Sequence, residues 1–382
     1  MNNRHTMSRQ KQLLISAALL LAVLVMSYIG LRYFVAPFAW AALFCAGALF
    51  AAIRMTNSSG WQALWLNMAI VAMVLGAFEG YLHIGRAPAR RDTVESLDGT
   101  PQKMTEAHEI LGYAPIPNLQ GIWSRTIGDD HVFRSEFSID SHGLRVGPTA
   151  HSADLPCVFF FGGSYTFGSG VNDEEAMPYL VAADFLRQYR VFNFGFRGYG
   201  PHQMLAALEH DIYGDSLGCQ PTHAIYQMIP DHVSRAAGFA SWDENGPQYE
   251  LNAQGVAMQI GTFARGKQEP PGKLLRILNR SLIVQRLKQF TQARPDEKSA
   301  DLTFAILQRA QEIVQERSSV AQFHVIYWPA DQSLLSVVVD KLERNGFDLH
   351  PISTVLYFTT FAFMRTVTKS MGDSNPRSGS YG

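Results

Sequence analysis

The chain has 382 residues, 47% of them hydrophobic, and a formal net charge of −1. This length exceeds what a single domain needs, and the near-zero charge argues against a nucleic-acid-binding protein. The hydrophobic residues are concentrated in the first 85 positions. We therefore expect a membrane region followed by a soluble part.

Three apolar runs make up the predicted membrane region, residues 1–85. Residues 13–31 carry no charge, and at ~1.5 Å per residue they can cross a bilayer core of ~30 Å. Residues 33–53 and 55–78 form the second and third runs. Because two apolar runs follow the first, a cleavable signal peptide is disfavoured. The sequence predicts about three transmembrane helices, with two helices and an interfacial segment as the alternative.

The charges that flank these runs do not decide which way the chain crosses the membrane. Lys and Arg mark the cytoplasmic side, and each side has four of them: Arg4, Arg9, Lys11 and Arg54 against Arg32, Arg86, Arg90 and Arg91. Since the first helix often dominates, its basic tail favours a cytoplasmic N-terminus. Three crossings then predict a soluble domain outside the inner membrane, in the periplasm.

Two short regions precede the main domain. Residues 86–107 are polar and contain Pro88 and Pro101, which indicates a linker. Residues 108–152 form a small β-containing preamble, since HVFRSEFSIDSHGLRV (131–146) partly alternates before a turn at 142–143. The main domain is expected over 153–382.

In that domain strands alternate with helices. Short apolar runs at 157–162, 189–195, 223–229 and 323–329 predict strands, and residues 174–189, 201–213, 301–316 and 331–346 have helical patterns. This order implies an α/β fold with a parallel sheet covered on both faces. Ligands bind beyond the carboxyl ends of such strands, and CVFFFG ends there in Gly162, Gly163 and Ser164.

Two stretches carry a resemblance to a known family. FFFGGSYTFGSGV resembles the first block of SGNH hydrolases, the GDSL-like esterases and acyltransferases, with Ser164 on the nucleophile and Gly163 in place of the usual aspartate. VFNFGFRGYG is similar to the second block, with Gly198 on the oxyanion-hole glycine. The resemblance covers residues 108 to about 346 and implies a flavodoxin-like three-layer sandwich. LGYAPIPN and FSIDSHGLRV are like the preamble of membrane-anchored bacterial members.

The third and fourth blocks depart from the family pattern. In IYQMIPDHVSR, Asp231 fits the family's aspartate, but Pro230 stands where an asparagine donates to the oxyanion, and His232 is the candidate replacement. For the base, FDLHPI offers Asp348 and His350. The alternative location of the fourth block is the later MGDSNP. Residue 375 there is asparagine, which cannot act as a base in place of histidine, so the C-terminus would be incomplete or atypical. We expect His324 to be structural.

The resemblance implies a membrane-anchored serine esterase or O-acyltransferase acting on acyl, chiefly acetyl, groups of a cell-surface glycan. A membrane-bound acyltransferase is a candidate partner. The alternative is a catalytically impaired member that binds a glycan or a partner enzyme. No His, Cys, Asp and Glu cluster has the spacing of metal ligands, and we expect neither a metal nor a cofactor.

Two further expectations concern the surroundings of the sheet. Residues 241–263 predict a β-hairpin above the site, either a lid or a decoration, and the polar residues 264–300 are expected around its rim. In the fold that the resemblance implies, Cys157 and Cys219 lie at the amino-terminal edge of neighbouring strands, within reach of a disulfide. The alternative is two free buried thiols.

Overall fold

The structure is a computed structural model that describes residues 37–55, 58–84, 93–98, 104–185, 188–212, 214–264, 278–291, 293–331 and 333–352. The chain divides into two compact units. The first comprises Met1–Arg91 and Gln268–Ala293, and the second comprises Asp92–Lys267 and Arg294–Gly382. Each unit is described by itself.

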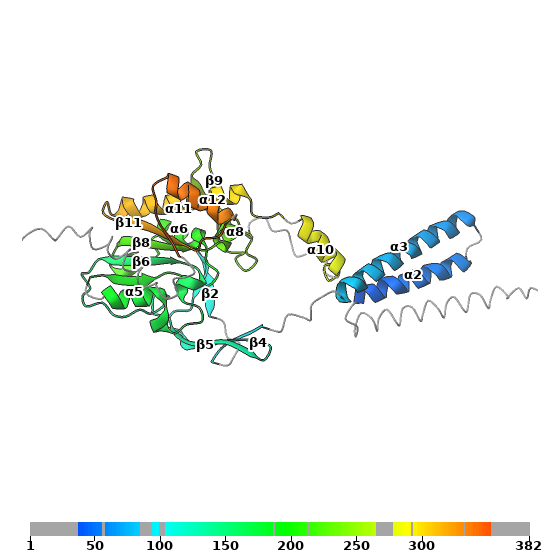
Figure 1. The fold of residues 1–382 in the computed structure, drawn as a ribbon, viewed down its shortest axis with the longest axis horizontal. Helices are drawn as coiled ribbons and strands as arrows, with labels where there is room; N and C mark the ends of the chain where they lie inside the picture. Colours follow the sequence, from blue (N-terminus) through cyan, green and yellow to red (C-terminus); the bar gives the residue numbers. More distant parts are fainter. Residues whose placement is uncertain are drawn as a thin grey trace, which may run out of the picture. The chain divides into compact units, whose positions relative to one another are not determined.

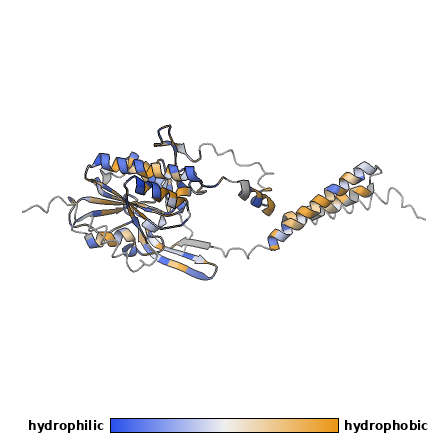
Figure 2. Cartoon of the chain, turned by 45° about the horizontal axis from the view of Figure 1, so that its top comes forward, coloured by the Kyte–Doolittle hydropathy of each residue, from blue (hydrophilic) through white to orange (hydrophobic). Residues whose placement is uncertain are grey.

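The first unit is built on two apolar helices, α2 (Pro37–Met55) and α3 (Ser59–Ile84), which pack against each other (Figures 1 and 2). In the described part of the chain, α3 is the helix long and apolar enough to cross a membrane. Large apolar side chains on it stay exposed, among them Trp61, Val71 and Val74. The predicted first span, residues 13–31, lies outside the described residues.

Helix α10 (Leu282–Thr291) belongs to this unit because its start is bound by Glu79 of α3. The Glu79 carboxylate, 1% exposed, accepts hydrogen bonds from Ser281 Oγ at 2.8 Å and from the backbone nitrogens of Leu282 and Ile283 at 2.7 and 3.1 Å. These N–H groups have no partner within the helix, so the carboxylate satisfies them. Whether residues 264–300 lie around the rim of the site stays a prediction.

The second unit contains a five-stranded parallel sheet of the flavodoxin type. Its strands are β6 (Cys157–Gly162), β7 (Arg190–Asn193), β8 (Pro221–Met228), β11 (Gln322–Tyr327) and β12 (Asp348–Pro351). Their order across the sheet is β12-β11-β8-β6-β7, and all neighbours are parallel. In chain order this is 2-1-3-4-5 read from β7, the flavodoxin order. The predicted fold class is confirmed.

Helices cover both faces of this sheet, which gives the three layers visible in Figure 1. Because successive side chains of a strand point to opposite faces, Phe159 and Phe161 enter the larger core while Val158 and Phe160 enter the smaller one. The larger core is closed by α6 (Pro201–Glu209), α8 (Asp231–Ala236), α11 (Glu297–Arg317) and α12 (Leu334–Arg344). The smaller core is closed by α5 (Met177–Phe185).

Smaller antiparallel elements surround the sheet. Strands β1 (Thr93–Leu97), β4 (Gln120–Ile127) and β5 (Asp130–Ser138) pair in the order β1-β4-β5, and β2 (Thr105–His108) pairs with β3 (Gly112–Pro115). The predicted hairpin is confirmed as β9 (Pro247–Leu251) and β10 (Ala257–Thr262). The remaining short helices are α4 (Ser164–Phe167), a 3₁₀ turn at Asp173–Glu175, and α7 (Gly214–Leu217).

A buried arginine joins the preamble to the loop after β6. Arg145, 3% exposed, donates to the carbonyls of Phe167, Gly168 and Val171 and to the carboxylate of Asp173. A guanidinium offers five donors, and four bonds satisfy a charge that burial would otherwise penalise. The preamble thereby fixes the segment that follows Ser164.

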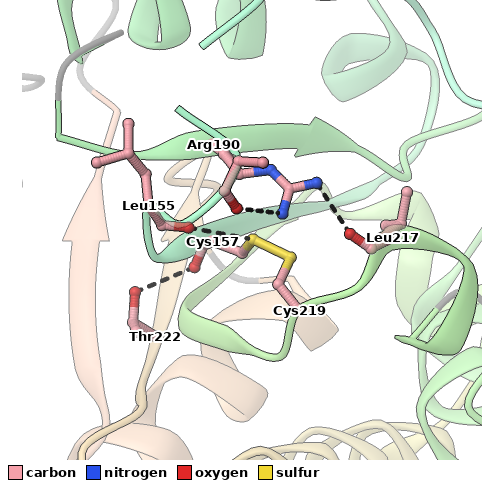
Figure 3. The surroundings of a disulfide bond; sticks show 7 residues. Leu155, Cys157, Arg190, Leu217, Cys219 and Thr222 are labelled. Atoms are coloured by element: carbon pink, nitrogen blue, oxygen red, sulfur yellow. Dashed lines mark hydrogen bonds between the residues drawn. A yellow bond between two sulfur atoms is a disulfide. The ribbon is translucent and has the colours of Figure 1, made fainter. Parts of the chain in front are cut away.

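The disulfide between Cys157 and Cys219 is present, with a Cα–Cα distance of 6.3 Å (Figure 3). It joins the first residue of β6 to the loop before β8, at the amino-terminal edge of the sheet. Thr222 Oγ1 donates to the Cys157 carbonyl at 3.1 Å, and Arg190 donates to the Leu217 carbonyl at 2.9 Å, so the same loop is held from both sides (Figure 3). The sequence prediction of a bridge is confirmed.

Candidate active site

Ser164 lies at the point where β6 turns into α4. Gly162 has φ +153°, and a Cβ built on it would lie 2.1 Å from Thr166 Oγ1 and 3.0 Å from the carbonyl oxygen of Gln227, so the turn admits only glycine there. Ser164 is the first residue of α4 and is half-buried. It follows the carboxyl end of β6, next to β8. The strand order reverses between these two strands, which is where ligands of this fold bind.

The loop that carries Gly198 contacts the loop that carries Ser164. The Phe196 nitrogen donates to the Gly162 carbonyl at 3.2 Å, and Asn193 Nδ2 donates to the Thr166 carbonyl at 3.0 Å. Gly198 has φ +81°, and a Cβ on it would lie 2.6 Å from both Tyr113 Oη and Trp242 Nε1. The two sequence blocks that predicted nucleophile and oxyanion glycine therefore meet at one edge of the sheet.

Two side chains of α8 lie against Gly163. A Cβ on Gly163 would lie 2.9 Å from His232 Nε2 and 2.9 Å from an Arg235 guanidinium nitrogen, with the Tyr199 carbonyl oxygen at 3.3 Å. Arg235 is held there by donating to that carbonyl at 2.8 Å. A side chain at position 163 would therefore displace His232 or Arg235.

His232 presents an N–H group beside Gly163. Its Nδ1 lies 2.7 Å from the Tyr226 hydroxyl, and burial raises the pKa of that phenol well above its usual value, so the hydroxyl keeps its proton. We assign this hydroxyl as the donor to Nδ1. Burial and the charge of Arg235 lower the pKa of His232 well below its usual value. The neutral ring then carries its proton on Nε2, which is buried and has no hydrogen-bond partner in the described part of the chain.

A buried carboxylate behind these groups was not singled out from the sequence. Asp243 Oδ2 accepts from Gln203 Nε2 at 2.7 Å and lies 2.8 Å from His202 Nε2, and both partners open helix α6. The preceding Trp242 donates to the Gly198 carbonyl at 3.4 Å. A signal was present in the sequence, because a helix that starts after a parallel strand directs its first residues toward the ligand edge. Asp243 itself lies in a loop and has no such signal.

Aromatic side chains flank the site on the surface. Trp242 is 58% exposed and lies against Gly198, and Phe239 is 41% exposed. Tyr165, directly after Ser164, is 56% exposed, and its ring centroid lies 5.5 Å from that of Trp328. Large exposed aromatic residues at the mouth of a site are typical of surfaces that bind ligands.

The structure does not bring His350 to Ser164. His350 lies on β12, which is separated from β6 by β11 and β8, and its Nε2 lies 3.1 Å from Asp348 Oδ1. Burial lowers the pKa of His350, and the hydrogen bond from His324 lowers the pKa of Asp348. The alternative base region, residues 373–375, lies outside the described residues. This placement does not support His350 as the base.

No family model and no curated protein matches the chain. Among solved structures, it is similar to an acetyl xylan esterase, Est2A, from the rumen bacterium Butyrivibrio proteoclasticus, with TM-score 0.33 and 12% identity, covering 60% of this chain and 66% of that one. A carbohydrate esterase with catalytic and non-catalytic binding functions gives TM-score 0.32 and 10% identity, covering 61% of this chain and 68% of that one. A haloalkane dehalogenase variant from Bradyrhizobium elkanii gives 0.23 and 11%, covering 74% and 97%. These scores are too low to carry an argument about fold or function.

Proposed function

We propose that the second unit is a serine esterase or O-acyltransferase of the SGNH type with Ser164 as nucleophile. The observation that carries this proposal is the buried His232 Nε2, which has no hydrogen-bond partner among the described residues and lies beside the Gly163–Ser164 turn, together with the contact between that turn and the Gly198 loop. Both lie at the ligand-binding edge of a flavodoxin-like sheet.

The chemistry needs a nucleophile and donors for the charge that develops. The Ser164 hydroxyl attacks the acyl carbon and gives its proton to a general base, and the carbonyl oxygen becomes an oxyanion in the tetrahedral intermediate. When this intermediate collapses, the bond to the sugar oxygen breaks, the base returns the proton to the leaving alcohol, and the acyl group stays on Ser164 until water or an acceptor hydroxyl takes it. The backbone N–H groups of Ser164 and Gly198 and the His232 Nε2–H are the proposed donors. Because the His232 imidazole stays neutral with its proton on Nε2, it can donate a hydrogen bond to the oxyanion and does not take up the proton that Ser164 releases. His232 therefore takes the role that an asparagine side chain has in the family.

We further propose that the acyl group is an acetyl ester on a glycan. The exposed aromatic side chains of Trp242, which donates to the Gly198 carbonyl, and of Tyr165, directly after Ser164, suit the apolar faces of sugar rings. The apolar helix α3 supports anchoring in the inner membrane, and the Cys157–Cys219 bridge supports a domain in the oxidising periplasm. A membrane-bound acyltransferase remains the candidate partner.

The second candidate function is a catalytically impaired protein that binds a glycan through the same surface. The observation that favours it is the position of His350, since no histidine of the described residues is bonded to the Ser164 hydroxyl as a base requires. In this case the aromatic side chains, and not Ser164, determine the affinity for the glycan.

The full chain purified in detergent distinguishes the two. We expect hydrolysis of p-nitrophenyl acetate and of acetylated oligosaccharides by the wild type, and its loss in Ser164→Ala. The matched control is Ser169→Ala, five residues further on, whose hydroxyl has no described partner. Equal activity of Ser164→Ala and wild type would refute the nucleophile. Glycan binding without any hydrolysis, weakened by Trp242→Ala but not by Ser164→Ala, would support the second function.

A further inference from the structure

We propose that His324, Asp348 and His350 bind a divalent transition-metal ion, of the kind represented by Zn²⁺, at the β11–β12 edge of the sheet. One ring nitrogen of each histidine and one carboxylate oxygen lie within 4.8 Å of one another. The sequence analysis expected no metal site, because 24 residues separate His324 from Asp348. The parallel pairing of two strands removes that separation.

The sheet register brings the three side chains to one face. His324 of β11 stands directly opposite Asp348 of β12. Asp348 and His350 are two residues apart, so their side chains share a face of the strand. His324 Nδ1 lies 2.7 Å from Asp348 Oδ2, and His350 Nε2 lies 3.1 Å from Asp348 Oδ1. The carboxylate is thus approached by an imidazole from each side.

These distances are close to those of a metal site. Zinc bonds to nitrogen and oxygen of about 2.0–2.2 Å in a tetrahedron separate the ligand atoms by about 3.3 Å. The three ligand atoms lie within 4.8 Å of one another, so the widest pair would have to close by up to about 1.5 Å on binding. Two imidazoles and one carboxylate are a ligand set that suits Zn²⁺ and its neighbours rather than Mg²⁺ or Ca²⁺. The fourth position is left to water.

A further histidine supports the first ligand from behind. His223 of β8 has its Nδ1 3.2 Å from His324 Nε2. Metal-bound histidines almost always use their second nitrogen in this way, donating to an acceptor that fixes the ring. When the ion takes His324 Nδ1, the proton of His324 resides on Nε2 and is donated to His223 Nδ1. His223 is 4% exposed and has no role in the proposed ester chemistry.

An ion can reach this site from solvent, and its binding would join two strands of the sheet. The Asp348 side chain is 47% exposed, whereas those of His324 and His350 are 1% and 14% exposed, so an ion reaches the buried nitrogens from the carboxylate side. Bound there, it would link β12, the edge strand, to β11. It lies two strands away from β6 and Ser164 and does not take part in the proposed reaction.

Metal titration of the full-length protein tests this proposal. The protein is purified in detergent with a tag that lacks histidine, stripped with a chelator, and titrated with Zn²⁺ by calorimetry and with Co²⁺ by visible absorption. We expect one ion per chain. Asp348→Asn and His350→Ala should lose this binding, and His223→Gln should weaken it by about 10–100-fold. The matched control is His142→Ala, since His142 lies 3.7 Å from Asp140 on the surface and has no third ligand group among the described residues.

Thermal unfolding gives a second readout. An ion that binds the folded chain raises its melting temperature by mass action. Zn²⁺ should therefore stabilise wild type, His142→Ala and Ser164→Ala, but not Asp348→Asn. The proposal is overturned if the stripped wild type takes up no ion, or if Asp348→Asn and His350→Ala bind it as the wild type does. Either result leaves the esterase proposal untouched, because that proposal is tested separately by the esterase activity of Ser164→Ala.

Discussion

At the scale of single residues, the position of Gly163 is too crowded for a larger side chain. Its φ of −96° is not in the left-handed region, and a methyl group added there would lie 2.9 Å from His232 and Arg235. We expect Gly163→Ala to lower the free energy of unfolding by about 1–3 kcal/mol through overpacking and to lower kcat by displacing His232. Urea unfolding and acetate-ester kinetics measure both.

The control is Gly147→Ala, where the nearest atom to an added Cβ is the Val191 carbonyl oxygen at 3.9 Å. That substitution should leave stability and kcat unchanged. A fully active and fully stable Gly163→Ala protein would mean that neither stability nor catalysis depends on the present positions of His232 and Arg235.

His232 should act as a hydrogen-bond donor rather than as a base. Removal of one oxyanion donor typically costs ~10²–10³ in kcat, and we expect that loss for His232→Ala with little change in KM. His232→Gln keeps an N–H donor and should recover part of the rate, which loss of a base would not allow. Steady-state kinetics on p-nitrophenyl acetate decide between the two roles. Equal losses in both variants would count against the donor.

The lowered pKa of His232 also affects stability. Below pH 6.5 the unfolded chain protonates this histidine while the folded chain does not, so its contribution to stability is lost as pH falls from 6.5 toward the lowered pKa. The slope is at most about 1.4 kcal/mol per pH unit for one proton. In His232→Gln the fall in melting temperature between pH 7 and pH 5.5 should be smaller than in the wild type. An unchanged pH dependence would show that His232 is not buried in its neutral form.

At the scale of elements, the Cys157–Cys219 bridge constrains a long loop. The sequence separation is 62 residues, and closure of a loop of that length removes about 4 kcal/mol of denatured-state entropy in the chain-entropy model. The double variant Cys157→Ala/Cys219→Ala should be less stable by about 2–4 kcal/mol in urea. Reduction of the wild type should have the same effect and should leave the double variant unchanged. A double variant as stable as the oxidised wild type would contradict the constraint.

Much of the fold follows from sequence patterns, whereas the site follows only in part. The apolar run of β6 and the glycine turn after it are local signals, so the strand, the turn and the position of Ser164 could be predicted. The bridge of Cys157 could be predicted once neighbouring strands were assumed. The pairing of His324 with Asp348, the capping of α10 by Glu79 and the burial of Asp243 depend on packing between distant segments. No local pattern contains that information.

At the scale of the whole molecule, the inserted segment that ends in α10 returns to the unit that contains α2 and α3. Glu79 and the start of α10 are 202 residues apart in the chain and are joined by a buried hydrogen bond. The first unit is therefore assembled from two parts of the sequence. The second unit is connected to it both before β1 and after β10.

The proposed location of the soluble unit predicts the oxidation state of its cysteines in the cell. In native membranes, alkylation without prior reduction should leave Cys157 and Cys219 unmodified, because both are in the bridge, and alkaline extraction should leave the protein in the membrane. The control for reagent access is a parallel sample that is alkylated in denaturant with and without prior reduction, since only the reduced bridge should then be modified. Mass spectrometry of the peptides reports the result. Alkylation of both Cys157 and Cys219 would indicate a reducing compartment and reverse the proposed orientation.

The central claim is that Ser164 is an activated nucleophile, and its covalent reaction with a fluorophosphonate probe tests that most directly. The full-length protein is incubated with the probe, and the adduct is located by peptide mass spectrometry. The account predicts one adduct, on Ser164, in the wild type and in Ser169→Ala, none in Ser164→Ala, and none in urea-unfolded protein. An unlabelled Ser164 in the folded wild type, or equal labelling of Ser164→Ala, would contradict it.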